Sequence, residues 1–232
     1  MGRVLRNPKL WLFAACLLPL ARLVALGASG GLGANPIEFI TRSTGTWTLV
    51  GLLVTLAVTP LRRLTGRAGL IRYRRMLGLF AFFYACLHFT TYIWLDQFFD
   101  LAGIGKDIVK RPFITVGFAA FVLLIPLAVT SNHRMMRRLG RRWQQLHRLI
   151  YPIALLGVIH YLWLVKKDVT QPLIFGAVLT LLLIMRLPWR LGALQTLWPF
   201  GAVKPAKAGR RRADDARKGR GVNAAGSFSR GQ

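Results

Sequence analysis

Six long apolar runs limit what this chain can fold into more than any other feature. They cover about residues 10–27, 45–61, 76–95, 112–130, 147–165 and 172–188. A helix needs about 20 residues to cross the hydrocarbon core of a bilayer, where every backbone polar group must find its partner within the protein. Hydrophobic residues make up 54% of the 232, a share that soluble domains of this length rarely reach. The sequence therefore predicts an all-α fold, an integral membrane six-helix transmembrane bundle.

The first run has an alternative interpretation as a secretory signal peptide. Arg3, Arg6 and Lys9 precede it, and the small residues "LGASG" follow it. However, the apolar stretch is long, Arg22 interrupts its distal part, and five further runs follow. We therefore expect a retained first helix.

The distribution of basic residues predicts the orientation of the bundle. The connections between runs two and three and between runs four and five are rich in arginine, and both ends of the chain are basic. Under the positive-inside rule, both termini lie in the cytoplasm. The net charge of +26 is thus mostly a topology signal. Because these charges do not form a folded basic face, we expect no nucleic-acid partner.

The chain is expected to hold one membrane domain with short cytoplasmic extensions. The predicted parts are the cytoplasmic N-terminus 1–9, the bundle 10–190, a candidate interfacial helix 191–202 and a disordered basic cytoplasmic tail 203–232. The basic clusters of the tail are expected to attract anionic lipids of the inner leaflet. We find no convincing internal repeat.

Local patterns add two expectations about individual segments. In the first outer connection, Asn35, Pro36 and Glu38 have the spacing of a capped short helix. Cys16 and Cys86 lie in apolar runs without metal-ligand spacing, so we interpret them as small core residues.

Three of the four histidines lie in or at the edge of apolar runs. The stretch "QQLHRLIYPIALLGVIHYLW", residues 144–163, contains His147 near its start and His160 deep within it, and His88 lies in run three. Ionisable groups in hydrocarbon are costly and indicate function by default, although a single one is as often a helix contact. His133 lies in a basic inner connection, where we expect it to be solvated.

His88 and His160 are predicted to lie at the same depth in the membrane. They stand twelve and thirteen residues along runs that both lead outward. At about 1.5 Å per residue, both lie about 18–20 Å from the inner edge. Two neutral imidazoles on separate helices at one depth can supply both axial ligands of a haem iron. Such a haem has no open coordination position, so its expected role is electron transfer.

His147 raises the question of a second haem. It should lie about 20 Å below His160, but an ideal helix places the two rings about 140° apart. Pro152 lies between them and can kink or rewind the helix. Run three offers Arg75, not a histidine, at the matching position before His88. The residues therefore predict one haem and leave a second one open.

Around these histidines the sequence resembles a known family. The motifs "LIRYRRMLGL", "CLHFTTY", "LGRRWQQLHRLIYP" and "IHYLW" are similar to the MsrQ (YedZ) family, and "GLGANP", "RPF" and "QPLIF" add to the match. The resemblance covers about residues 8–190 and lies within the ferric-reductase-like transmembrane superfamily. The family's haem histidines match His88, His147 and His160, and His133 matches none.

The resemblance implies a function that composition does not. Such proteins are the b-type haem subunit of a bacterial methionine sulfoxide reductase system. They pass electrons from the quinone pool across the inner membrane to MsrP, a periplasmic molybdopterin enzyme that repairs oxidised periplasmic proteins. The chain would then be an electron-transfer subunit and not the catalytic one. The family also implies FMN, although no glycine-rich phosphate loop follows a strand here.

Four arginines are candidates for contacts with anionic cofactor groups. Arg72, Arg74 and Arg75 lie near the inner end of run three and could meet an FMN phosphate or a propionate, although topology alone accounts for them. Arg22 could face a haem propionate or extend to the interface. The outer connections, including residues 31–45 and 96–111, are the expected docking surface for the partner.

Two other functions are compatible with parts of the sequence. The first is a stand-alone transmembrane ferric or cupric reductase, but relatives of that kind usually carry a soluble flavin and nicotinamide domain, which is not found here. The second is a scaffold or transporter without redox activity, whose histidines make contacts between helices. Haem content and partner-free ferric reduction separate these alternatives.

Overall fold

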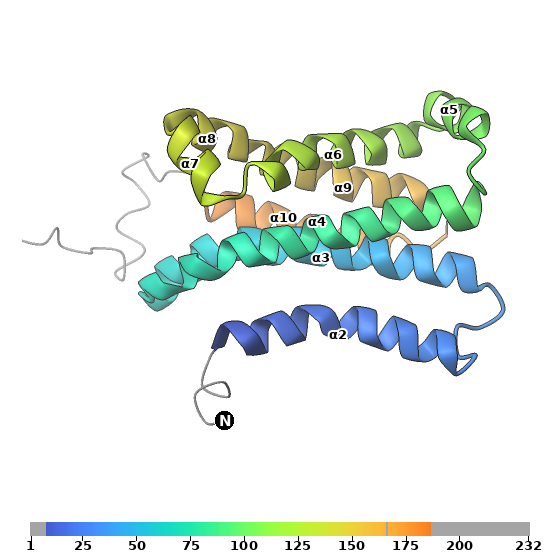
Figure 1. Ribbon diagram of the computed structural model, residues 1–232, viewed down its shortest axis with the longest axis horizontal. Coiled ribbons are helices and arrows are strands. Elements are labelled where there is room, and N and C mark those ends of the chain that lie inside the picture. Colours follow the sequence, from blue (N-terminus) through green and yellow to red (C-terminus); the bar gives the residue numbers. More distant parts are fainter. Residues whose placement is uncertain (1–7, 166, 187–232) are drawn as a thin grey trace, which may run out of the picture. The chain divides into compact units, whose positions relative to one another are not determined.

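The computed structural model describes residues 8–165 and 167–186, and the regular structure within them is helical (Figure 1). In chain order the elements are α2 (Pro8–Ala28), α3 (Pro36–Thr65), η1 (Ala68–Tyr73), α4 (Arg74–Thr91), η2 (Tyr92–Asp96), α5 (Leu101–Lys110), α6 (Pro112–Val129), α7 (His133–Leu139), α8 (Arg141–Leu146), η3 (His147–Leu149), α9 (Ile150–Leu164) and α10 (Thr170–Ile184). The predicted segments 191–202 and 203–232 lie outside the described residues.

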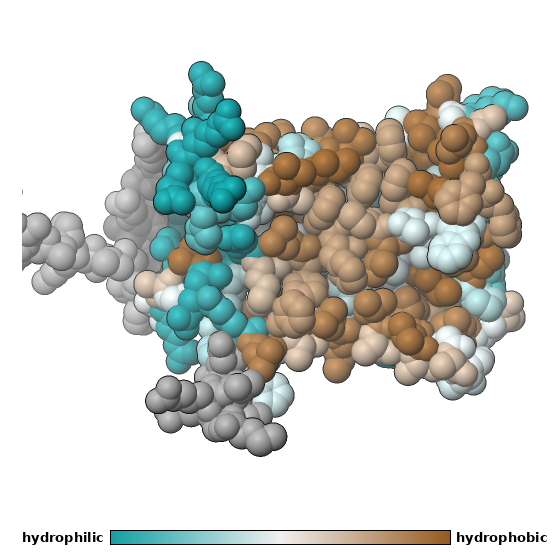
Figure 2. Space-filling view, in the orientation of Figure 1, coloured by the Kyte–Doolittle hydropathy of each residue, from teal (hydrophilic) through white to brown (hydrophobic). Residues whose placement is uncertain are grey.

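Five helical stretches are long and apolar enough to cross a membrane. They are Pro8–Ala28, Pro36–Thr65, Ala68–Asp96, Pro112–Val129 and Arg141–Leu164. The sixth predicted run corresponds to α10, which is apolar but has only 15 residues among those described. Figure 2 shows a broad band of hydrophobic side chains, with the most hydrophilic surface at the end that carries α7 and α8.

Helix α3 confirms the predicted cap but corrects the length of the helix. The backbone N–H of Glu38 donates to Asn35 Oδ1 at 3.3 Å, and Pro36 occupies the first turn, where its missing N–H costs nothing. The separate short helix predicted here is wrong, because the helix continues without a break into the second apolar run. It ends at Gly66, whose φ of 67° is the left-handed conformation that terminates helices.

The core forms where α3 packs against α4 and where α6 packs against α9. Leu56 of α3 and Ile153 of α9 are almost completely buried. A Cβ on Gly51 would stand 3.0 Å from Ala81 Cα, so small residues allow the α3 and α4 backbones to approach closely. Within lipid, such close contact replaces the hydrophobic driving force as the main source of helix association.

The cysteine expectation is met only in part, because neither cysteine belongs to the buried core of the described residues. Cys16 and Cys86 are both free and partly buried. The Tyr84 hydroxyl donates to the Cys16 carbonyl at 2.8 Å, which connects α4 to α2. Cys16 therefore contributes a backbone acceptor, while its thiol takes no part in a disulfide.

The start of α9 shows the rewinding expected near Pro152. His147–Leu149 form a 3-10 turn, and the α-helix resumes at Ile150. Proline has no N–H to bond the carbonyl one turn earlier, so the segment before it is free to wind more tightly. This turn changes the rotation of His147 relative to the residues of α9.

Candidate functional site

The structure brings His88 of α4 and His160 of α9 into one cavity. Their ring centres are 6.2 Å apart and their planes are inclined by 73°. The cavity has a volume of about 610 Å³ and is lined by residues of α3, α4, α6 and α9. Volumes of this order suit a cofactor or another large ligand.

A helix carbonyl holds each histidine ring by its Nδ1 atom. His88 Nδ1 donates to the Thr41 carbonyl of α3 at 2.9 Å, and His160 Nδ1 donates to the Phe113 carbonyl of α6 at 2.6 Å. A carbonyl oxygen can only accept, so Nδ1 carries the proton in both neutral rings. The Nε2 atom of each ring is then left with the lone pair that binds metals. Carbonyl-bound Nδ1–H groups are the usual support of histidine ligands.

Glycines on the same two helices make room for the rings. A Cβ on Gly45 of α3 would lie 3.0 Å from His88 Cε1, and a Cβ on Gly117 of α6 would lie 2.7 Å from His160 Nδ1. Each glycine stands one helical turn after the carbonyl that its histidine bonds. The two helices thus repeat one arrangement. In each, a backbone carbonyl accepts a hydrogen bond from a histidine of the neighbouring helix, and a glycine leaves space for its ring.

Among the described residues, the site offers two histidine rings as metal ligands. Within residues 8–165 and 167–186, no group of three or more His, Cys, Asp or Glu side chains is placed to hold a metal ion. A metal bound here by the two Nε2 atoms would need its other ligands from a non-protein group. A macrocycle with four nitrogen atoms meets that requirement.

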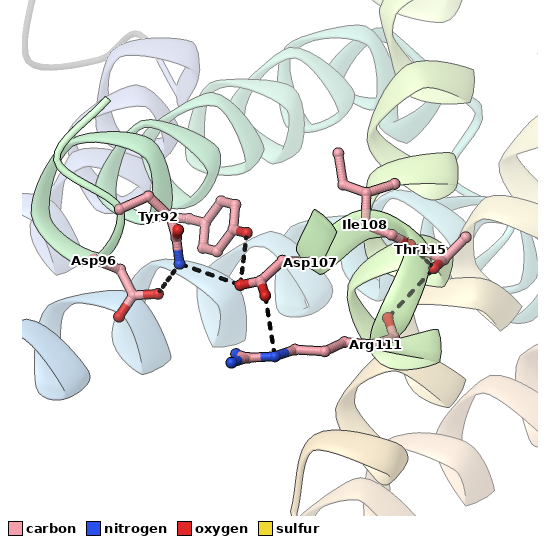
Figure 3. Close-up of polar contacts among 7 residues, drawn as sticks. Tyr92, Asp96, Asp107, Ile108, Arg111 and Thr115 are labelled. Atoms are coloured by element: carbon pink, nitrogen blue, oxygen red, sulfur yellow. Dashed lines mark hydrogen bonds and ion pairs between the residues drawn. The ribbon is translucent and has the colours of Figure 1, made fainter. Parts of the chain in front are cut away.

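The cavity is lined in part by Tyr92, Asp96 and Arg111, which belong to a network of polar contacts around Asp107 of α5 (Figure 3). Asp107 accepts from the Tyr92 hydroxyl at 3.4 Å and from Gln97 Nε2 at 3.2 Å, and it pairs with Arg111 Nε at 3.2 Å. Gln97 also donates to Asp96 at 3.3 Å. These contacts connect η2 and the residue after it to α5 and to Arg111, immediately before α6. They place Arg111 beside the cavity.

His147 lies in a different environment, directly after α8. Its ring stacks on Trp143 with centres 3.9 Å apart, and its Nδ1 lies 3.1 Å from the Trp143 carbonyl. Its Nε2 lies 3.5 Å from the Ser131 hydroxyl. Within the described part of the chain, His160 and His88 are the paired histidines, and His147 has no histidine partner.

Arg74 lies near His147, and Arg186 lies near Arg74. Arg74 is partly buried. Arg186, which follows the end of α10, donates to the Leu56 carbonyl, and its Nη1 donates to the Tyr151 hydroxyl at 3.0 Å. These contacts connect the segment after α10 to α3 and α9. The surroundings of His147 are therefore polar and cationic.

The other predicted site residues are spread over the surface. Arg72 is exposed and lies 5.1 Å from the Tyr73 ring centre, and Arg75 is exposed. Arg22 lines a second cleft, between α2, α3 and the α9–α10 connection, and does not line the histidine cavity. His133 is exposed, as expected for a solvated residue.

Comparison with known proteins gives the family. A sequence model described as "Ferric reductase like transmembrane component" matches residues 44–158. A protein of Herminiimonas arsenicoxydans is 62% identical over 78% of this chain and 84% of its own length. Proteins of Ralstonia nicotianae and Bordetella pertussis are 60% and 56% identical, each over 83% of this chain and over 90% and 92% of their own lengths. All three are named "Protein-methionine-sulfoxide reductase heme-binding subunit MsrQ".

The chain belongs to the MsrQ family. The resemblance found in the sequence is confirmed by these relatives, and the transmembrane family together with the five long apolar helices makes the chain a multi-pass membrane protein. No solved structure matches it. The MsrQ relatives cover most of the chain.

The two glycines that leave space for the histidine rings give a prediction about stability. Gly117→Ala should destabilise the protein by about 1–3 kcal/mol, because the new methyl group meets the His160 ring. Gly45→Ala should act in the same direction on His88. The control is Gly157→Ala in the same cavity, whose Cβ would make an ordinary contact of 3.4 Å with Leu49 Cδ1. Thermal unfolding in detergent measures the stability of all three variants. Equal unfolding midpoints would contradict the claim that Gly45 and Gly117 leave space for the rings.

Proposed function

We propose that this protein binds a b-type haem between His88 and His160 and transfers electrons through it. The observation that carries the proposal is the separation of the two rings. An iron bonded to one nitrogen of each ring at about 2 Å sets the ring centres about 6 Å apart. The two centres are 6.2 Å apart. Rotation of one ring plane about the common iron–nitrogen axis leaves this distance unchanged, so the inclination of 73° is compatible with it.

The surroundings of the rings support the same ligand. The cavity is large, each Nε2 atom has a lone pair for a metal, and the glycines leave close-fitting space for the rings. The names of the relatives include haem binding, and their sequences match most of this chain. The residues present therefore fit a bis-histidine haem.

In this proposal the protein residues bind the haem, orient its two ligands and exclude water. The bound haem supplies the one-electron redox chemistry. The carbonyls of Thr41 and Phe113 fix the tautomer and direction of the two imidazoles. Apolar residues of the cavity, among them Leu52 and Leu124, exclude water and lower the local dielectric constant. With both axial positions taken by histidine, the site is suited to electron transfer and not to substrate binding.

The direction of transfer that we propose is from the inner side of the membrane to the outer side. The donor is the quinone pool or a flavin, and the acceptor is MsrP, a periplasmic molybdopterin reductase that repairs oxidised proteins. The membrane is the bacterial inner membrane. The position of the His88–His160 cavity near the outer helix ends supports an outward exit. FMN, with Arg72, Arg74 or Arg75 near its phosphate, remains part of the proposal through the family resemblance.

Replacing either axial ligand tests this function. His88→Ala and His160→Ala should each lose the low-spin b-type spectrum and the reoxidation of the reduced protein by purified MsrP. His133→Ala, on an exposed residue, is the control and should keep both. Full haem content in both ligand variants would refute the assignment. Rapid reduction of a ferric chelate without MsrP would instead favour the stand-alone ferric or cupric reductase.

A second haem at His147 is a separate proposal. The stacked and partly buried imidazole, with cations nearby, is a candidate ligand at the inner end. His147→Ala should then reduce the haem content from two per chain to one and leave the outer spectrum intact. Haem and flavin are quantified by pigment extraction in both proteins. One haem per chain in the wild type would limit the site to His88 and His160.

We also propose that six helices cross the membrane and that both termini face the cytoplasm. In that topology α5 lies on the outer side. A reporter that works only in the cytoplasm should be active when fused after Gln232. A reporter that works only outside should be active when inserted at Gly105, where the surrounding space is open. The reverse pattern would invert the proposed direction of transfer.

A further inference from the structure

The outer mouth of the histidine cavity contains two arginines that the sequence did not single out. Arg42 of α3 and Arg111, immediately before α6, both line the cavity that contains His88 and His160. Arg42 follows Thr41, whose carbonyl holds His88. Arg111 stands two residues before Phe113, whose carbonyl holds His160. Each helix that positions a ligand histidine thus also carries a cation at the same end.

Both arginines have donors left for a ligand. Arg42 Nη2 pairs with Glu38 Oε1 at 2.8 Å, and Arg111 pairs with Asp107 through Nε alone. The other guanidinium N–H groups of both side chains have no partner within residues 8–165 and 167–186. The two arginine side chains are 61% and 54% exposed, and ion pairs at such exposure restrain a side chain only weakly. Each guanidinium can therefore bind a second carboxylate.

A third donor at the mouth is buried and lacks a partner. Thr41 Oγ1 is the one buried side-chain polar atom without a hydrogen bond among the described residues, and Thr41 lines the same cavity. Buried hydroxyl groups are nearly always bonded, so an unbonded one next to a cavity indicates a missing acceptor. The neighbouring Thr44 and Thr48 hydroxyls both donate to backbone carbonyls of their own helix.

We propose that Arg42, Arg111 and the Thr41 hydroxyl bind the two carboxylate groups of the haem. This inference rests on the proposed function, which places a haem in the cavity. Arginine binds carboxylates through paired N–H groups, and two guanidinium groups serve two propionates. Arg22, the candidate from the sequence, does not line the histidine cavity, whereas Arg42 lines both that cavity and the second cleft, which contains Arg22. The carboxylates thus point to the outer surface, and each is held by the helix that also fixes a ligand histidine.

The test compares haem with haem dimethyl ester, which has the same macrocycle but no carboxylates. Purified apoprotein in detergent is titrated with each, and the Soret band gives the dissociation constants. The wild type should bind the ester at least tenfold more weakly than haem. Arg42→Gln and Arg111→Gln should weaken haem binding but leave ester binding almost unchanged. The ester already lacks the carboxylate that each arginine binds, so removing the arginine costs no further affinity. Arg137→Gln, on an exposed arginine that lines neither cleft, is the matched control and should retain the full difference. Arg22→Gln tests the candidate from the sequence.

Two further variants test the hydroxyl. Thr41→Val should weaken haem binding and spare the ester, whereas Thr48→Val, on a hydroxyl that is already bonded, should change neither. Removing a nearby cation should also lower the haem reduction potential in Arg42→Gln and Arg111→Gln, since positive charge stabilises the reduced state.

The outcomes separate this inference from the proposed function. Equal affinity of the wild type for haem and its ester would overturn the carboxylate site and leave the axial ligation standing. Failure of the wild type to bind either compound would refute the haem itself. Loss of the difference in Arg22→Gln alone would assign the carboxylates to the second cleft. The comparison of the two compounds in the wild type needs no variant, so a misfolded variant does not prevent the test.

Discussion

An imidazole inside a membrane must have a partner for each of its two nitrogens, and this requirement organises the bundle. The Nδ1 atoms of His88 and His160 are bonded to backbone carbonyls of other helices. A carbonyl already bonded within its own helix is accessible to a second donor where the neighbouring side chain is small. Gly45 and Gly117 provide that access. Once Nδ1 is fixed, the Nε2 lone pairs remain, and a neutral imidazole binds metals through such a lone pair.

The two halves of the site are built in the same way. In each half a histidine from one helix bonds a carbonyl on another helix, and the two residues are 47 positions apart in both cases. The helix pairs involved, α3 with α4 and α6 with α9, are also the most closely packed pairs of the bundle. The contacts that stabilise each pair therefore also set the position of its ligand. A displacement of either pair would change the distance between the rings.

The sequence predicted the features that depend on single helices. Apolar length predicted the spans, Asn35 and Pro36 predicted the start of α3, and the spacing within two runs predicted that His88 and His160 would meet. It missed the contacts between helices that position the two rings. Nothing in the sequence distinguishes Gly117 from a packing glycine, because its neighbour His160 is distant in the chain. The two half-sites share a spacing but little residue identity, which explains why no repeat was apparent.

The surroundings of His147 differ from those of the His88–His160 pair. Within the described residues, His147 lies beside Trp143 and near Arg74, and no second histidine faces it. A metal there would keep one position for a ligand other than histidine, and the cationic surroundings would favour anionic groups. The cavity of His88 and His160, in contrast, offers a histidine ligand from each of two helices. The first site is thus suited to a ligand that changes, and the second site is suited to a group held permanently between two protein ligands.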